Sequence, residues 1–273
     1  MLASLNISVW NPKRKDKIAT LETLIKHSAG RDAGAFIKNL LPDGAIDPVK
    51  KAESTLRRIF YNHTLPWQDN GIRILPSAAW IDFSAQERAA RAEFDTAVGQ
   101  FLLDYDAHRA KAQITLNGLF NAADYPSVEE VRTKFGVNIS WMPLPDSGDF
   151  RVDMPEEDLK QIREELAKAS EASMGAARAD LYDRLSTALM AVTSRLDEPG
   201  KVFRDSLIGN LRTVCADIPK LNIMDDAGIL KLAAEAERIA ALDPEAIRMD
   251  DNVRAKANQT ASDILASMGI TSC

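Results

Sequence analysis

Basic residues near the N-terminus are the first candidates for chemistry. Lys13, Arg14, Lys15 and Lys17 follow directly after Asn11-Pro12. Asn and Pro favour the N-cap and the first position of a helix, so these cations fall in the first turns of a predicted helix. Positive charge there opposes the helix dipole, whereas helix amides together with Lys and Arg attract phosphate or carboxylate groups. The segment is therefore either an anion site or a solvated run of charge.

A second basic group lies on a predicted helix over 47–63 and continues past it. Its charged and aromatic members are Lys50, Lys51, Arg57, Arg58, Tyr61, Trp67 and Arg73. Arg57 and Tyr61 are four residues apart and share a helix face, as in surfaces that bind single-stranded nucleic acid by phosphate contact and base stacking. No named nucleic-acid motif matches the spacing. The alternative is that Ile59, Phe60 and Trp67 are core and that the arginines pair with acidic residues.

Acidic residues crowd the start of a long predicted helix over 155–196. They are Asp153, Glu156, Glu157, Asp158, Glu164, Glu165 and Glu171. Paired carboxylates serve as acid and base or bind a divalent metal, but a catalytic pair needs burial or a partner that separates the two pKa values. These acids lie mainly off the apolar stripe of the helix, which favours a solvated face. The Asp225-Asp226 and Asp250-Asp251 pairs are typical helix starts.

Histidines, cysteines and glycine motifs form no catalytic pattern. His27, His63 and His108 lie far apart, with no HExxH or CxxC beside them, and His108 falls on an apolar stripe that favours a packing role. Cys215 and Cys273 make no disulfide framework, which fits a reducing compartment. GxxxxGK[ST], GxGxxG and GxSxG are absent. We therefore predict no catalytic residue, no metal and no cofactor, and an enzyme is disfavoured.

The first 83 residues are predicted to form a basic, mixed α/β base. Alternating apolar residues indicate a strand over 1–10. Helices are then expected over 12–27, 32–41 and 47–63, and the Asn70-Gly71 turn precedes a short strand within 72–83. Residues 84–200 are assigned to a long helical hairpin, and residues 201–273 to C-terminal helices that pack on the base.

Two apolar stripes at heptad-like spacing carry the helical hairpin. The first runs from Phe94 to Leu119 on one helix over 84–120, and the second begins with Leu159, Ile162 and Leu166. Helices near 38 and 42 residues would span on the order of 55–65 Å and pair antiparallel. A cap at 123–154 is expected at the tip, with a short helix over 127–135 and a β-hairpin formed by 137–141 and 150–153. Three further helices are expected over 202–218, 226–242 and 250–268. The predicted fold class is mainly α (α+β), with a coiled-coil hairpin.

Several stretches resemble an uncharacterised family of tailed-phage and prophage proteins, classed as a domain of unknown function. They include Thr64-Leu-Pro-Trp67, 71–76, 121–130, 149–153 and Phe203-Arg-Asp-Ser-Leu207. The resemblance covers most of the chain. It implies a phage-encoded protein in the bacterial cytoplasm, in some genomes beside a MoxR-like ATPase, and supplies no catalytic residues.

Composition and charge limit the class of function. The chain has 273 residues, 45% hydrophobic and 27% charged, and a net charge of −6, and it contains neither a signal peptide pattern nor an apolar run long enough to cross a membrane. Residues 1–76 carry 12 basic and 7 acidic side chains, hence +5, and the rest carry 22 and 33, hence −11. We expect a cytoplasmic, non-enzymatic interaction protein that binds itself or another protein. Single-stranded nucleic-acid binding in phage recombination or replication, and inhibition of host defence, are the alternatives.

Overall fold

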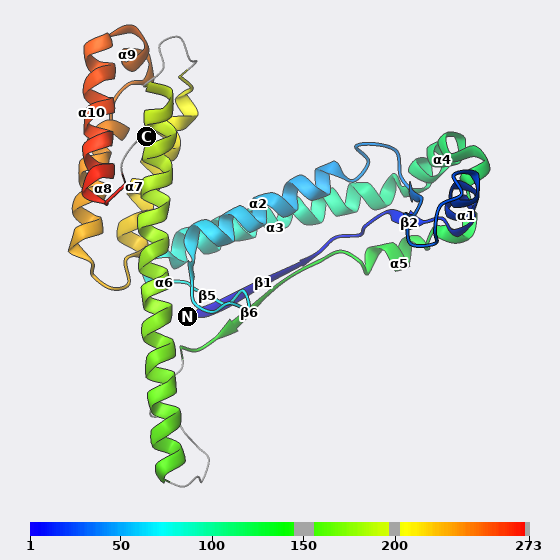
Figure 1. Cartoon of the computed structure of the whole chain (residues 1–273), viewed down its shortest axis with the longest axis horizontal. Coiled ribbons are helices and arrows are strands. Elements are labelled where there is room, and N and C mark those ends of the chain that lie inside the picture. Colours follow the sequence, from blue (N-terminus) through cyan, green and yellow to red (C-terminus); the bar gives the residue numbers. More distant parts are fainter. Residues whose placement is uncertain (145–155, 197–202, 271–273) are drawn as a thin grey trace. The chain divides into compact units, whose positions relative to one another are not determined.

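The computed structural model describes residues 1–144, 156–196 and 203–270 (Figure 1). The described residues are mainly helical with a small amount of β-structure, which confirms the predicted fold class. The helices are α1 (Lys17–Lys26), α2 (Asp47–His63), α3 (Trp80–Leu103), α4 (Tyr105–Leu116), α5 (Val128–Arg132), α6 (Glu156–Leu196), α7 (Asp205–Leu221), α8 (Ala227–Ala240), α9 (Pro244–Met249) and α10 (Asp251–Ser267). The strands are β1 (Leu2–Ser8), β2 (Lys13–Lys15), β3 (Ile37–Asn39), β4 (Leu65–Pro66), β5 (Arg73–Ile74) and β6 (Gly136–Met142).

The chain forms two compact units that are each assembled from distant stretches of sequence. The first unit contains Met1–Ser4, Tyr61–Phe83 and Ser140–Cys273, and the second contains Leu5–Phe60 and Ser84–Ile139. The chain therefore passes from one unit to the other within β1, α2, α3 and β6.

Helix α6 organises the first unit. Its C-terminal half buries an apolar stripe that includes Leu181, Leu185, Leu189 and Val192, and this half packs mainly against α7 and α10, with α8 alongside. Figure 1 shows these helices beside the C-terminal half of α6 and none of them beside its first turns. The earliest buried residue of α6 is Ser173.

A four-stranded sheet has the order β4-β5-β1-β6. Leu2 of β1 and Leu65 of β4 are both registered against Ile74 of β5, and both pairings are antiparallel. The turn between β4 and β5 contains Gly71 at φ +83°, a conformation that glycine adopts readily. The Asn70-Gly71 turn and the short strand that follows it are thus confirmed.

An aromatic cluster forms the core of the second unit. The ring of Trp10 lies 6.2 Å from that of Phe101 and 5.8 Å from that of Tyr105. His108 stacks on Phe101 with ring centroids 5.9 Å apart, which confirms its packing role. The Tyr105 hydroxyl donates to the carbonyl oxygen of Pro126 at 2.9 Å, so its one polar atom is satisfied.

The prediction of a helix over 12–27 is wrong at the N-terminal end. Helix α1 begins at Lys17, and its N-cap is Asp16, whose carboxylate accepts from the amides of Ile18 and Ala19 at 3.1 and 3.0 Å. Lys13–Lys15 instead form β2, which pairs antiparallel with β3. This arrangement keeps three cations out of the first helical turn, where the helix dipole would oppose them.

One further prediction for the first 83 residues is wrong. The helix expected over 32–41 is replaced by β3, because this segment supplies the partner strand of β2. The short strand expected within 72–83 is β5, and a 3-10 turn at Ser77–Ala79 leads from it into α3 at Trp80. The helix over 47–63 is confirmed as α2.

The long helix expected over 84–120 is divided into α3 and α4 by Asp104. Its stripe is only partly buried: Phe94, Phe101, Tyr105 and Ala112 are in the core. Helix α6 confirms the second long helix, but the buried part of its stripe is covered by α7, α8 and α10. The expected antiparallel pairing with the helix over 84–120 is therefore not what buries it.

The other predicted elements are confirmed where the structure describes them. Helix α5, strand β6 and helices α7, α8 and α10 fall where they were expected, and Asp226 and Asp250 are the N-caps of α8 and α10. The short helix α9 was not anticipated. The strand over 150–153, Asp153 and Cys273 lie outside the described residues.

Candidate functional site

A buried ammonium group anchors the basic N-terminal segment. The side chain of Lys38, on β3, is only 3% exposed. Its Nζ donates to Asp16 Oδ2 at 2.7 Å and to the carbonyl oxygen of Leu119 at 2.8 Å, and it pairs with Asp124 Oδ2 at 2.8 Å. A lysine ammonium has three donors. All three are therefore satisfied, by groups from two stretches of the second unit, one at Asp16 and one at 119–124.

The network shifts the titration of its members. Burial alone would lower the pKa of Lys38, but the hydrogen bonds from its ammonium to Asp124 and Asp16 outweigh burial and raise it. The pKa of Asp16 is lowered, first by its hydrogen bond from Lys38 and then by that from the Ala19 amide. The stabilisation from Lys38 is thus present below its usual pKa and is lost only in strong alkali. The stabilisation from Asp16 is present above its usual pKa and is lost in acid.

Asp16 occupies the place where an external anion was predicted. The helix amides that would hold phosphate are bonded to its carboxylate. Lys13, Lys15 and Lys17 are exposed, and Arg14 pairs with Asp124 Oδ1 at 3.0 Å. The chain itself therefore supplies the anion at this helix N-terminus.

Three of the four large apolar side chains of helix α1 face the solvent. Ile18, Leu21 and Ile25 are 73%, 57% and 68% exposed, whereas the buried residues of the helix are the small Ala19 and Thr20. We call Ile18, Leu21 and Ile25 the outer face of α1. Amphipathic helices normally bury such a stripe, and exposed apolar patches mark interaction sites.

The second predicted basic group is divided between solvent and acidic partners. Lys50, Lys51 and Arg58 are exposed on α2. Arg57 Nη2 lies 2.7 Å from Glu53 Oε1, one helical turn earlier. Ile59 and Phe60 are buried, as the core alternative predicts.

One pocket of the second unit, of about 680 Å³, is lined by members of both basic groups. Lys13 and Lys50 both contribute to it, but Asp43, Asp47 and Glu53 line the same pocket. Its charge is therefore mixed, which is unlike the positive groove that follows a nucleic-acid backbone.

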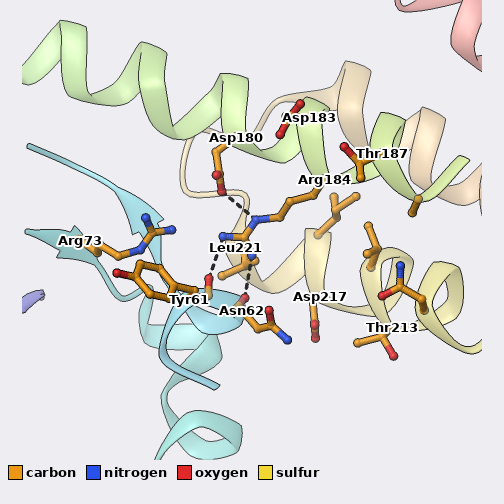
Figure 2. A pocket seen from close by; sticks show the side chains of 14 residues that line it. Tyr61, Asn62, Arg73, Asp180, Asp183, Arg184, Thr187, Thr213, Asp217 and Leu221 are labelled. Carbon is orange, nitrogen blue, oxygen red and sulfur yellow. Dashed lines mark hydrogen bonds and ion pairs between the residues drawn. The ribbon is translucent and has the colours of Figure 1, made fainter. Parts of the chain in front are cut away.

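A second pocket, of about 390 Å³, lies in the first unit beside the C-terminal end of α2 (Figure 2). Arg184 of α6 donates to the carbonyl oxygens of Asn62 at 2.8 Å, Tyr61 at 2.9 Å and Thr64 at 2.7 Å. Its Nε also donates to Asp180 at 2.7 Å. The last carbonyls of a helix have no intrahelical donor, so this guanidinium caps the end of α2.

Three predicted contact residues lie near this cap. Arg73 donates to the hydroxyl and carbonyl oxygens of Thr64 at 2.7 and 2.8 Å, and its guanidinium carbon lies 4.9 Å from the ring centroid of Tyr61. Burial and, more weakly, Arg184 lower the pKa of Arg73. Trp67 is 6% exposed. Trp67 is therefore a core residue, and one face of the Tyr61 ring is covered.

Two further titratable groups of the first unit have pKa values that burial raises. Asp217 lines the pocket of Figure 2, and burial raises its pKa. Burial likewise raises the pKa of the Cys215 thiol to about 11. The thiolate is the nucleophilic form of cysteine, so Cys215 is suited to packing.

The first turns of α6 present acidic residues to solvent. Every acidic residue predicted here that the structure describes is exposed, which confirms the solvated face. Leu159, Ile162 and Leu166 of the stripe are half-buried, and no residue before Ser173 is fully buried. We call Glu156–Ala172 the acidic half of α6.

The predicted contact residues are divided between the two units. Lys13 and Lys50 meet in one pocket, and Tyr61 and Arg73 line another in a different unit. Lys38, Arg184 and the outer face of α1 are not among the residues predicted from the sequence. Arg184 had a local signal, because Asp180 lies four residues before it; Lys38 had none, since its partners are distant in sequence.

Comparison with family models finds no match, and neither a curated protein nor a solved structure matches the chain. Within the part of the chain that the structure describes, no group of three or more His, Cys, Asp or Glu residues is placed to hold a metal ion. None of the helices described there is long and apolar enough to span a membrane.

Replacing Lys38 with methionine should destabilise the second unit by on the order of 3 kcal/mol, because Asp16 and Asp124 lose a buried counter-ion. Amide exchange across α1 and β3 should accelerate, and chemical denaturation should report the loss of stability. Lys15→Met, on the exposed paired strand, is the control and should change stability by about 0.5 kcal/mol or less. Equal stability of Lys38→Met and the wild type would contradict the anchoring role.

Replacing Arg184 with methionine should lower stability by about 2–3 kcal/mol, because three carbonyl oxygens at the end of α2 lose a charged donor. Arg184→Lys should recover only part of this, since an ammonium lacks the planar fork. Arg178→Met removes an arginine of the same helix that is 59% exposed and pairs with Asp226, and it should cost less than about 1 kcal/mol. Similar losses for the Arg178 and Arg184 variants would disprove the capping role.

Proposed function

We propose that the protein is a non-enzymatic helical interaction protein that self-associates. One observation carries this proposal: α1 directs Ile18, Leu21 and Ile25 into solvent, and its fully buried residues are only the small Ala19 and Thr20. Full burial of such a side chain is worth roughly 1.5–3 kcal/mol. Burial of these three side chains against a second protein surface would therefore stabilise association.

The charge pattern and the buried reactive groups support an interaction role over catalysis. The Cys215 thiol is buried with a raised pKa, and Arg73 and Arg184 are bonded to backbone oxygens. The phage origin, the cytoplasmic setting and docking on a MoxR-like ATPase, which the family resemblance implies, belong to this proposal. Self-association is the part that purified protein tests directly.

Sedimentation velocity of the purified chain should show an average mass that rises with concentration to at least twice the 30.0 kDa of one chain. Changing Ile18, Leu21 and Ile25 together to glutamine should weaken association at least tenfold, without loss of helicity in circular dichroism, because these side chains face outward. Ile114→Gln is the control, since Ile114 of α4 is 82% exposed but lies outside this face.

A wild-type chain that stays monomeric at every concentration would refute self-association. Equal weakening by Ile114→Gln would show that any exposed apolar side chain contributes, and that the outer face of α1 is not the contact.

A further inference from the structure

We propose that the outer face of α1 in one copy packs antiparallel against the acidic half of α6 in a second copy. This inference rests on the proposed self-association and names the two surfaces that meet. Both are helical faces without a covering helix among the described residues, and they lie in different units of the chain.

The two faces have the same spacing. Ile18, Leu21 and Ile25 are separated by three and four residues, and so are Leu159, Ile162 and Leu166. Each set therefore spans about 10 Å along its helix axis. Apolar residues at alternating steps of three and four are the pattern by which two helices pack side by side.

The acidic half of α6 is available for such a contact. It carries six acidic and three basic residues, and Figure 1 shows α7 to α10 beside the other half of the helix. Its stripe continues in register into Ser173, where the buried part of α6 begins. Among the described helices, α7, α8 and α10 therefore cover the stripe over one half of α6, whereas Leu159, Ile162 and Leu166 of the acidic half are half-buried and lack such a helical cover.

Charges beside the two stripes select the antiparallel direction. With Leu21 opposite Leu166 and Ile25 opposite Ile162, Lys17 and Glu165 lie on the same flank of the helix pair. On the other flank, Glu22 faces Arg163, and Lys26 faces Glu156. All three pairs are of opposite sign, and flanking charges of this kind set partner choice and orientation in paired helices.

In the parallel direction, the flanking charges would repel instead. With Ile18 opposite Leu159, Lys17 comes next to Arg163 and Glu22 next to Asp158. Both are pairs of like sign. Pairing α6 with α6 would bring together two halves that each have an excess of three acidic residues, and pairing α1 with α1 would bring together two sets of exposed lysines.

Because the two surfaces differ, the contact is heterologous. Each copy can use its α1 face on one neighbour and its α6 face on another, so copies add head to tail into a ring or a chain. This geometry makes a specific prediction about mixtures of defective variants.

Two variants each remove one face: Leu21→Gln with Ile25→Gln on α1, and Ile162→Gln with Leu166→Gln on α6. Each alone should sediment as a single chain of 30.0 kDa. An equimolar mixture should give a species of twice that mass and nothing larger, since it retains one intact α1 face and one intact α6 face. Circular dichroism of each variant checks that the helices are kept.

The outcomes separate the two proposals. If the wild type is monomeric, self-association itself fails. If the wild type associates but the α1 variant still dimerises alone, copies pair through α6 and this inference is overturned; failure of the mixture to combine overturns it equally.

Charge reversal gives a second test of the direction. Lys17→Glu and Glu165→Lys should each weaken association several-fold at low salt, and a chain carrying both changes should regain wild-type affinity. No regain in the double variant would exclude the antiparallel register.

Discussion

The buried ammonium of Lys38 is the interaction on which the N-terminal part of the second unit depends. It joins β3 to the N-cap of α1 through Asp16, and to the segment before α5 through Asp124 and Leu119. A buried charge is tolerated only when it is paired and hydrogen-bonded, and removal of one partner leaves the others uncompensated. The network therefore fixes where β2 and α1 lie and which side of α1 is turned outward.

This anchoring explains how α1 keeps its apolar residues in solvent. A helix of ten residues is marginal in water, and most helices gain stability by burying an apolar face. In α1 the fully buried residues are small, so polar bonds carry much of the attachment: the Asp16 cap, and the Thr20 hydroxyl that accepts from the Phe36 amide at 3.0 Å. The large apolar residues remain for a partner. In the proposed assembly that partner is an acidic helix half whose stripe has the same spacing.

The sequence predicts a helix best where three signals agree: an apolar stripe, an N-cap residue and a residue that ends the helix. Helices α8 and α10 are predicted by their N-cap residues Asp226 and Asp250 together with the apolar periodicity that follows. The hairpin turn is predicted by Gly71. Prediction fails where a distant partner decides. Asn11-Pro12 has the chemistry of a helix start, but Asp16 takes that role because Lys13–Lys15 pair with β3.

Prediction of the contact surfaces from the sequence fails for the same reason, because partners distant in sequence decide which residues are exposed. Charge and aromatic content alone indicate Trp67 and Arg57 as contact residues, and only three-dimensional packing reveals that one is buried and the other is paired with Glu53. The apolar spacing of Ile18, Leu21 and Ile25 is visible in the sequence, but it is typical of a buried face. Its exposure follows from the Lys38 network, whose members are up to 108 residues apart.

Hydrogen–deuterium exchange at two protein concentrations tests the central claim most directly. If α1 of one copy covers the acidic half of α6 in another, amides in 17–26 and 156–172 should gain protection together at high concentration and lose it together on dilution. Protection that changes in 156–172 alone, or in neither segment, would contradict the account.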